Sequence, residues 1–253
     1  MIVNEHIDKT LAKAKEIKQE YIYEEKETEE MTIEGISSTI EHTNLKPTAT
    51  SDDIKQLCEE AIKYNFRSVC IHPSYIPIAR DFLGDSPVKI VTVIGFPLGA
   101  NTSLIKSKET ENAISIGADE IDMVINQGRL QSGSFENVFF DIHKVVKTAG
   151  NVPVKVIIEA CNLTQEGIII ACLISEEAGA KYVKTSTGFG KHGATLEDVS
   201  LMRYCVSNNI KVKAAGGIRD LETAKKMIAN GAALLGTSSG IKILQGQKVN
   251  GTY

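Results

Sequence analysis

Two lysines stand inside segments that consist mostly of small and apolar residues. Lys184 lies in Y-V-K-T-S-T-G and Lys213 lies in K-V-K-A-A-G-G. A lysine withdrawn from water is costly unless it is paired, so such a position calls for a chemical explanation. A second ammonium nearby, together with the loss of water, favours the neutral amine of the first lysine. Because a neutral amine attacks carbonyl carbons, the pair predicts covalent Schiff-base chemistry at Lys184.

Carboxylates occupy comparable positions. Asp122 lies in E-I-D-M-V-I-N and Glu41 in I-E-H-T-N, and such carboxylates can move protons during catalysis. Lys155 and Glu159 share one face of V-K-V-I-I-E if this segment is a strand, because strand side chains alternate. The structural alternative, which the residues alone leave open, is a buried salt-bridge network without catalytic use. Its members would be Lys184, Lys213, Asp122 and Glu159.

Three glycine-containing segments follow the last three apolar runs. They are T-S-T-G-F-G (185–190), A-A-G-G-I-R (214–219) and G-T-S-S-G (236–240). Glycine lets backbone N–H groups approach an anion, and loops after the last strands of a barrel commonly bind phosphate. A single glycine loop is more often only a turn. Three on consecutive segments predict a phosphate-bearing substrate.

The elements that must position these residues alternate along the chain from about Gly35. Short apolar runs without polar alternation predict parallel strands buried on both faces, and most intervals show helical periodicity. Eight such units of about 25 residues predict an α/β fold, a (β/α)8 TIM barrel, with a doubly wound open sheet as the competitor. The predicted strands are residues 38–45, 68–72, 88–96, 120–126, 154–160, 182–186, 211–215 and 234–237.

The first 35 residues differ from the rest. Apolar residues recur at helical spacing up to Tyr21, and the mostly acidic run 24–30 follows. We predict an extra N-terminal amphipathic helix and an acidic connector in residues 1–35, ahead of the barrel in residues 36–253. The helix is expected to cap the barrel or to contact a second subunit.

Composition excludes several classes of protein. The net charge of -4 argues against nucleic-acid binding. The five cysteines lack metal-ligand spacing, and no run of about 18 apolar residues could span a membrane. We therefore expect a soluble, cytoplasmic enzyme that uses no metal and no cofactor.

Seven segments, in order, resemble deoxyribose-phosphate aldolases. The resemblance runs continuously from about residue 36 to 245. Its segments are 40–47, 91–101, 117–126, 154–159, 183–190, 212–219 and 236–240.

The resemblance implies a class I aldolase, a lyase that reversibly cleaves 2-deoxy-D-ribose 5-phosphate into D-glyceraldehyde 3-phosphate and acetaldehyde. Lys184 matches the Schiff-base lysine, Lys213 its cationic partner, and Asp122 part of the proton relay. It also implies association into a homodimer or homotetramer. The phosphate-binding positions would be Gly188, Gly216, Gly217, Gly236, Ser238 and Ser239.

Three positions depart from the family or extend it. Glu41 stands where many members have Asp, as an accessory member of the proton relay. Phe189 replaces a lysine that some members place beside the phosphate, and the chain ends in Tyr253, which in some members assists proton transfer. The alternative functions are another phosphosugar-binding barrel, of isomerase or synthase type, and a non-catalytic barrel.

Overall fold

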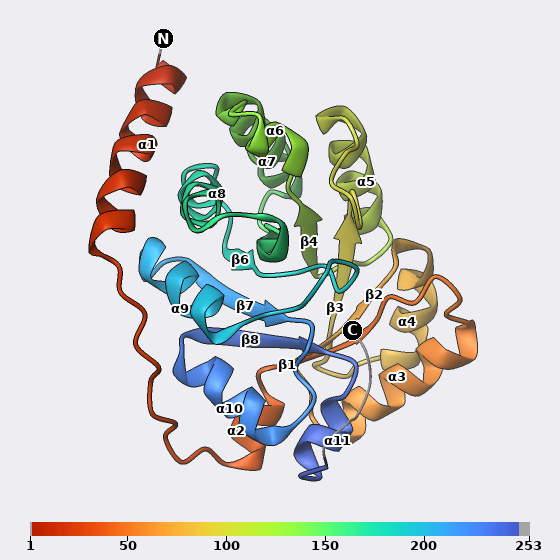
Figure 1. The fold of residues 1–253 in the computed structure, drawn as a ribbon. Helices are drawn as coiled ribbons and strands as arrows, with labels where there is room; N and C mark the ends of the chain where they lie inside the picture. Colours follow the sequence, from red (N-terminus) through yellow and green to blue (C-terminus); the bar gives the residue numbers. More distant parts are fainter. Residues whose placement is uncertain (1, 248–253) are drawn as a thin grey trace.

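The computed structural model describes residues 2–247 and shows a closed barrel of eight parallel strands in sequence order (Figure 1). Strand β1 pairs with both β2 and β8, which closes the barrel. The predicted TIM barrel is confirmed, and the open sheet is excluded. The strands are β1 (Ile40–Asn44), β2 (Ser68–Ile71), β3 (Lys89–Ile94), β4 (Glu120–Val124), β5 (Val154–Ile157), β6 (Tyr182–Lys184), β7 (Lys211–Ala215) and β8 (Ala232–Thr237).

Several strands end earlier than their apolar runs. The run 154–160 gives a strand only to Ile157, and the run 182–186 gives one only to Lys184. Buried residues follow both strands, Ile158 and Glu159 after β5 and Thr185 and Ser186 after β6. As a result Lys184 is the last residue of its strand, at the carboxyl end of the barrel.

Helices form the outer ring (Figure 1). The helix after β1 begins behind Thr50, whose hydroxyl accepts from the backbone N–H of Asp53 in a reciprocal capping box. The helices are α2 (Ile33–Ser37), α3 (Ser51–Lys63), α4 (Ile76–Leu83), α5 (Ser103–Ser115), α6 (Gln127–Gln131), α7 (Phe135–Ala149), α8 (Gln165–Glu177), α9 (Leu196–Cys205), α10 (Leu221–Ala229) and α11 (Gly240–Leu244), with 3-10 turns at Pro73–Tyr75 and Ala160–Asn162.

Apolar side chains fill the space between barrel and helices as one large cluster. Inside the barrel the apolar cluster is small. It consists of Leu45, Cys70, Val91 and Val93, with Phe96 packed against them. Much of the remaining interior is occupied by charged side chains, so the barrel cannot be held by apolar packing alone.

The N-terminal helix α1 (Ile2–Glu20) runs along the outside of the ring beside α8 (Figure 1). Its residues Ile7, Ala14 and Ile17 are buried, and Lys18 pairs with Glu166 at the start of α8 at 2.7 Å. Residues 21–32 form no helix or strand and pass α9 and α10 on the way to α2. Helix α1 therefore covers an apolar face of the barrel's outer layer.

Among residues 2–247 the helices are too short or too polar for any of them to cross a membrane.

Candidate active site

Lys184 and Lys213 lie side by side, because β6 and β7 pair in the register that sets these residues opposite each other. The Nζ of Lys184 is 2.8 Å from Asp122 Oδ2, and the Nζ of Lys213 is 2.6 Å from the same oxygen. All three side chains are almost completely buried. The three residues that the sequence indicated for catalysis thus form one hydrogen-bonded cluster.

Glu41 joins this cluster from β1. Its Oε2 accepts a hydrogen bond from Lys213 Nζ, and its Oε1 accepts one from Arg67 Nη1 at 3.0 Å. Glu41 is fully buried. It touches Lys213 and not Lys184, so its direct effect falls on the partner lysine.

A second layer of charges lies on the side of the cluster nearer the strand starts. Lys155 Nζ contacts Asp122 Oδ1 at 2.9 Å, Glu120 Oε2 at 2.7 Å and Glu41 Oε1 at 3.4 Å. Arg67 Nη2 donates to Glu120 Oε1 at 2.5 Å. Oδ1 of Asp122 therefore contacts Lys155, whereas Oδ2 contacts Lys184 and Lys213.

Lys155 carried a usable sequence signal, a lysine within an apolar strand. Arg67 and Glu120 carried none. Arg67 precedes β2 and Glu120 opens β4, and charged residues at strand starts are normally read as facing solvent. Only the closed barrel turns them inward.

The charges of the cluster support one another. Burial alone would raise the pKa of the Asp122 carboxyl, but Lys155, Lys184 and Lys213 outweigh burial and hold that pKa well below its usual range. Burial alone would lower the pKa of Lys213, but Asp122 and Glu41 outweigh it and raise that pKa. Asp122 is therefore an anion and Lys213 a cation at neutral pH.

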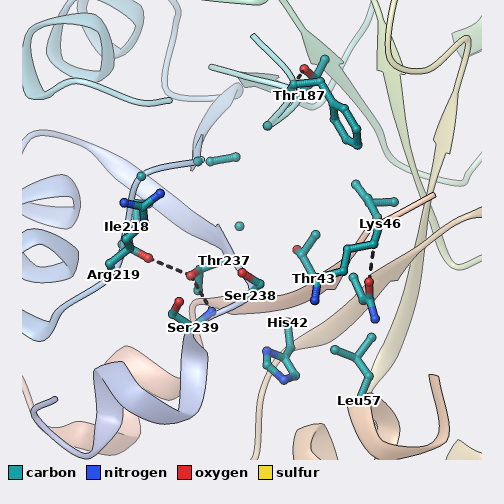
Figure 2. A pocket seen from close by; sticks show the side chains of 18 of the residues that line it. His42, Thr43, Lys46, Leu57, Thr187, Ile218, Arg219, Thr237, Ser238 and Ser239 are labelled. Carbon is teal, nitrogen blue, oxygen red and sulfur yellow. Dashed lines mark hydrogen bonds between the residues drawn. The ribbon is translucent and has the colours of Figure 1, made fainter. Parts of the chain in front are cut away.

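A cavity of about 640 Å³ opens above the cluster at the carboxyl ends of the strands, with Lys184 among its lining residues. Figure 2 shows its wall around the loops after β7 and β8. This is the end of a barrel where substrates bind. All six predicted phosphate-binding residues line the cavity, namely Gly188, Gly216, Gly217, Gly236, Ser238 and Ser239.

The loops after β7 and β8 are tied together by one hydroxyl. Thr237 Oγ1 donates to the carbonyl of Ile218 at 2.8 Å and accepts from the backbone N–H of Ser239 at 3.0 Å (Figure 2). A side chain at Gly236 would meet Lys213 Cε at 3.1 Å. Gly236 therefore makes room for the lysine stem as well as lining the cavity.

The structure places Glu159 differently from the strand alternation. Because β5 ends at Ile157, Glu159 is free to adopt a left-handed conformation, with φ 53°. Its carboxylate accepts hydrogen bonds from the backbone N–H and the hydroxyl of Thr187. Glu159 thus holds the loop that follows Lys184 instead of joining the lysine cluster.

Other residues that line the cavity include Phe189, Lys46 and Arg219. Phe189 is half-exposed and meets the edge of Phe96 at a ring-centroid distance of 5.5 Å. Lys46 and Arg219 bring positive charge from the loops after β1 and β7.

Tyr253, predicted as an accessory residue, lies outside the described residues. Within residues 2–247, no group of three or more His, Cys, Asp or Glu side chains has an arrangement that could hold a metal ion.

Comparison with known proteins gives consistent relatives. Residues 35–246 match the model of the family described as DeoC/LacD family aldolase. A Thermotoga maritima protein named deoxyribose-phosphate aldolase is 52% identical over 246 residues, 97% of each chain. A Brevibacillus brevis protein of the same name is 52% identical over 218 residues, 86% of this chain and 99% of that one. The solved, tetrameric deoxyribose phosphate aldolase from Aeropyrum pernix superposes with a TM-score of 0.78 at 31% identity, covering 93% of this chain and 95% of that chain.

Proposed function

This chain belongs to the DeoC/LacD family of aldolases, and on that premise we propose that it reversibly cleaves 2-deoxy-D-ribose 5-phosphate into D-glyceraldehyde 3-phosphate and acetaldehyde through a Schiff base on Lys184. The enzyme is a carbon-carbon lyase. Relatives named for this activity match nearly the whole chain, and the buried lysine pair supplies the nucleophile that such chemistry needs.

The charge balance of the barrel interior carries the assignment of Lys184. The cluster, buried except for the partly exposed Arg67, holds three carboxylates against four cationic side chains, one positive charge too many if every group is ionised. Uncompensated charge is costly away from water, so one cationic group is best left neutral. The carboxylates are Glu41, Glu120 and Asp122, and the cationic side chains are Arg67, Lys155, Lys184 and Lys213.

Lys184 is the lysine whose charge is least compensated. Lys155 contacts three carboxylates and Lys213 contacts two, whereas the one carboxylate recorded in contact with Lys184 is Asp122. Lys184 is also the lysine of the cluster that lines the cavity. The nucleophile is therefore assigned to Lys184, which a substrate carbonyl can reach from the cavity.

The first half of the reaction forms the covalent intermediate. The Lys184 amine attacks C1 of the open-chain sugar to give a carbinolamine, and loss of water gives an iminium ion. The positive nitrogen now withdraws electrons from the neighbouring C2–C3 bond. Asp122, already in contact with Lys184 Nζ at 2.8 Å, stabilises this new positive charge.

The second half breaks and remakes bonds at C2. The Asp122–Lys213 pair accepts the proton of the C3 hydroxyl, through water, and the C2–C3 bond cleaves to release glyceraldehyde 3-phosphate. The enamine left on Lys184 takes up a proton at C2, and water hydrolyses the iminium to acetaldehyde and free lysine. Glu41, which contacts Lys213, is an accessory member of this relay.

The phosphate end of the substrate is assigned to the loops after β6, β7 and β8. Gly188, Gly216 and Gly217 all have positive φ angles, 93°, 78° and 78°. Glycine adopts this conformation without a steric penalty. Together with Gly236, Ser238 and Ser239 in the same wall, they support the binding of an anion through backbone and hydroxyl groups.

Reductive trapping tests the proposal. The protein is incubated with acetaldehyde and borohydride, and the adduct is read by intact mass and peptide mapping. One reduced ethyl adduct on the Lys184 peptide is expected. Lys184→Leu should lose it, and Lys181→Leu, a matched change of an exposed neighbour, should retain it.

Adducts scattered over surface lysines would refute the Schiff-base assignment. If the protein then bound phosphosugars without trapping, an isomerase or synthase type of barrel would replace the aldolase. If it neither bound nor trapped, a non-catalytic barrel would be the better description.

Two features of the whole molecule belong to the proposal. The family match begins at residue 35, which supports treating residues 1–35 as an extension in front of the barrel. The Aeropyrum pernix relative is tetrameric, which supports a homo-oligomer, dimer or tetramer, for this chain.

A further inference from the structure

Positive charge is sparse around the cavity. The lysines and arginines among its described lining residues are Lys46, Lys184 and Arg219. Lys184 Nζ contacts Asp122 and, in the proposed reaction, forms the bond to the carbonyl carbon of the substrate. Lys46 and Arg219 are therefore the cationic side chains of the described lining that lie outside the lysine cluster.

These two side chains come from opposite sides of the loop after β8. In Figure 2 Arg219 lies on one side of Ser238, and the Lys46 side chain extends from the other side toward Thr43 and Ser238. Lys46 follows β1, where its backbone N–H donates to Asn44 Oδ1 at 3.3 Å. A phosphate held by Ser238 and the glycine loops would thus lie between two cations.

The wall behind Lys46 carries negative charge. Helix α3 lines the cavity with the carboxylates of Asp53 and Glu60. Hydrogen bonds from Thr50, and to a lesser degree the charge of Lys46, lower the pKa of Asp53, so it is an anion. Glu60 Oε2 lies 2.7 Å from His42 Nε2. Without Lys46, this wall would repel a phosphate dianion.

We propose that Lys46 is a specificity-determining residue that binds the phosphate monoester of the substrate opposite Arg219 and screens it from the carboxylates of α3. The inference rests on the proposed function for the identity of the substrate. It assigns to the loop after β1 a part in distinguishing phosphorylated from free sugars. Charge-assisted hydrogen bonds to phosphate are among the stronger polar contacts, so the loss of Lys46 should weaken substrate binding by a measurable amount.

Steady-state kinetics with two substrates test it. Lys46→Met should raise KM for 2-deoxyribose 5-phosphate about tenfold, with kcat changed less than about twofold. The kcat/KM for unphosphorylated 2-deoxyribose should stay unchanged. Lys46→Arg should restore most of the KM. Lys55→Met removes the same charge from an exposed site of α3 outside the cavity lining and should leave both substrates unaffected.

An unchanged KM for the phosphorylated sugar, or an equal loss for both sugars, would overturn the assignment. Calorimetric titration of inorganic phosphate separates this inference from the proposed function, because it needs no turnover. Phosphate binding weakened about tenfold in Lys46→Met supports the inference even if the protein cleaves neither sugar. Equal phosphate binding by wild type and Lys46→Met overturns it even if both cleave the sugar.

Discussion

Lys184 and Lys213 face each other in the β6–β7 register, and their ammonium nitrogens approach the same oxygen of one aspartate at 2.8 Å and 2.6 Å. Two lysines on one carboxylate oxygen cannot both be fully compensated by it. This relationship makes the charge of one lysine depend on the charge of the other.

Removing the charge of Lys213 should move the activity to higher pH. Without Lys213 the cluster holds three carboxylates and three cationic groups, so the surplus positive charge is gone. We expect Lys213→Leu to lower kcat/KM at pH 7 by at least about a hundredfold and to shift the pH optimum upward. The measurement is a pH–rate profile. Lys213→Arg keeps the charge, and an unshifted optimum in Lys213→Leu would contradict the argument.

The ionised carboxylate of Glu120 should stabilise the folded protein, and this stabilisation should be lost at acid pH. Burial alone would raise the pKa of Glu120, but Arg67 and Lys155 outweigh it and lower that pKa from 4.5 to about 2. The stabilisation is complete above pH 4.5 and is lost as the pH falls toward about 2. At about 1.4 kcal/mol per pKa unit, Glu120→Gln should lower the unfolding free energy by about 3 kcal/mol at pH 7.

Urea unfolding at pH 7 and at pH 3.5 measures this effect, and the difference between Glu120→Gln and wild type should be smaller at pH 3.5. Glu111→Gln is the control, because Glu111 makes an exposed ion pair with Lys108. A change below about 0.5 kcal/mol is expected there. A pH-independent difference for Glu120→Gln would show that packing, and not ionisation, explains its effect.

Phe189 should limit the affinity for phosphate. Its ring lines the cavity, is half-exposed and brings no charge. Phe189→Lys should lower KM for 2-deoxyribose 5-phosphate about fivefold and leave the unphosphorylated sugar unaffected. Phe189→Leu separates the new charge from the loss of the edge contact with Phe96. The same gain in Phe189→Leu would mean that the ring obstructs the site.

Helix α1 should stabilise the fold without serving catalysis. Ala14 is 1% exposed, so an arginine there cannot fit without displacing the helix. Ala14→Arg should lower the unfolding free energy by about 2 kcal/mol, measured by urea unfolding, with kcat unchanged. Ala12→Arg, on the exposed side of the same helix, should have little effect. A parallel loss of kcat in Ala14→Arg would link α1 to the active site.

The predicted elements agree with the structure where periodicity is strong. Strand β7 has the predicted bounds, and α3, α5 and α7 lie in intervals between predicted strands. Helix α4 is short, and Pro77 interrupts its helical pattern. Its proline lies in the first turn, where the missing N–H costs nothing. Strand ends were overestimated where buried loop residues continued the apolar composition.

The sequence by itself determined that Asp122, Lys184 and Lys213 enter the barrel, because lysine and aspartate in apolar segments must be buried together with the apolar residues around them. It also determined the order of the eight units and the glycine-containing loops at their ends. The tertiary structure decided the partners. Lys213 reaches Glu41 across 172 residues of chain, and Arg67 and Glu120 turn inward only when β8 closes on β1. Charge balance depends on distances between strands, so the surplus cation that points to Lys184 appears only in the closed barrel.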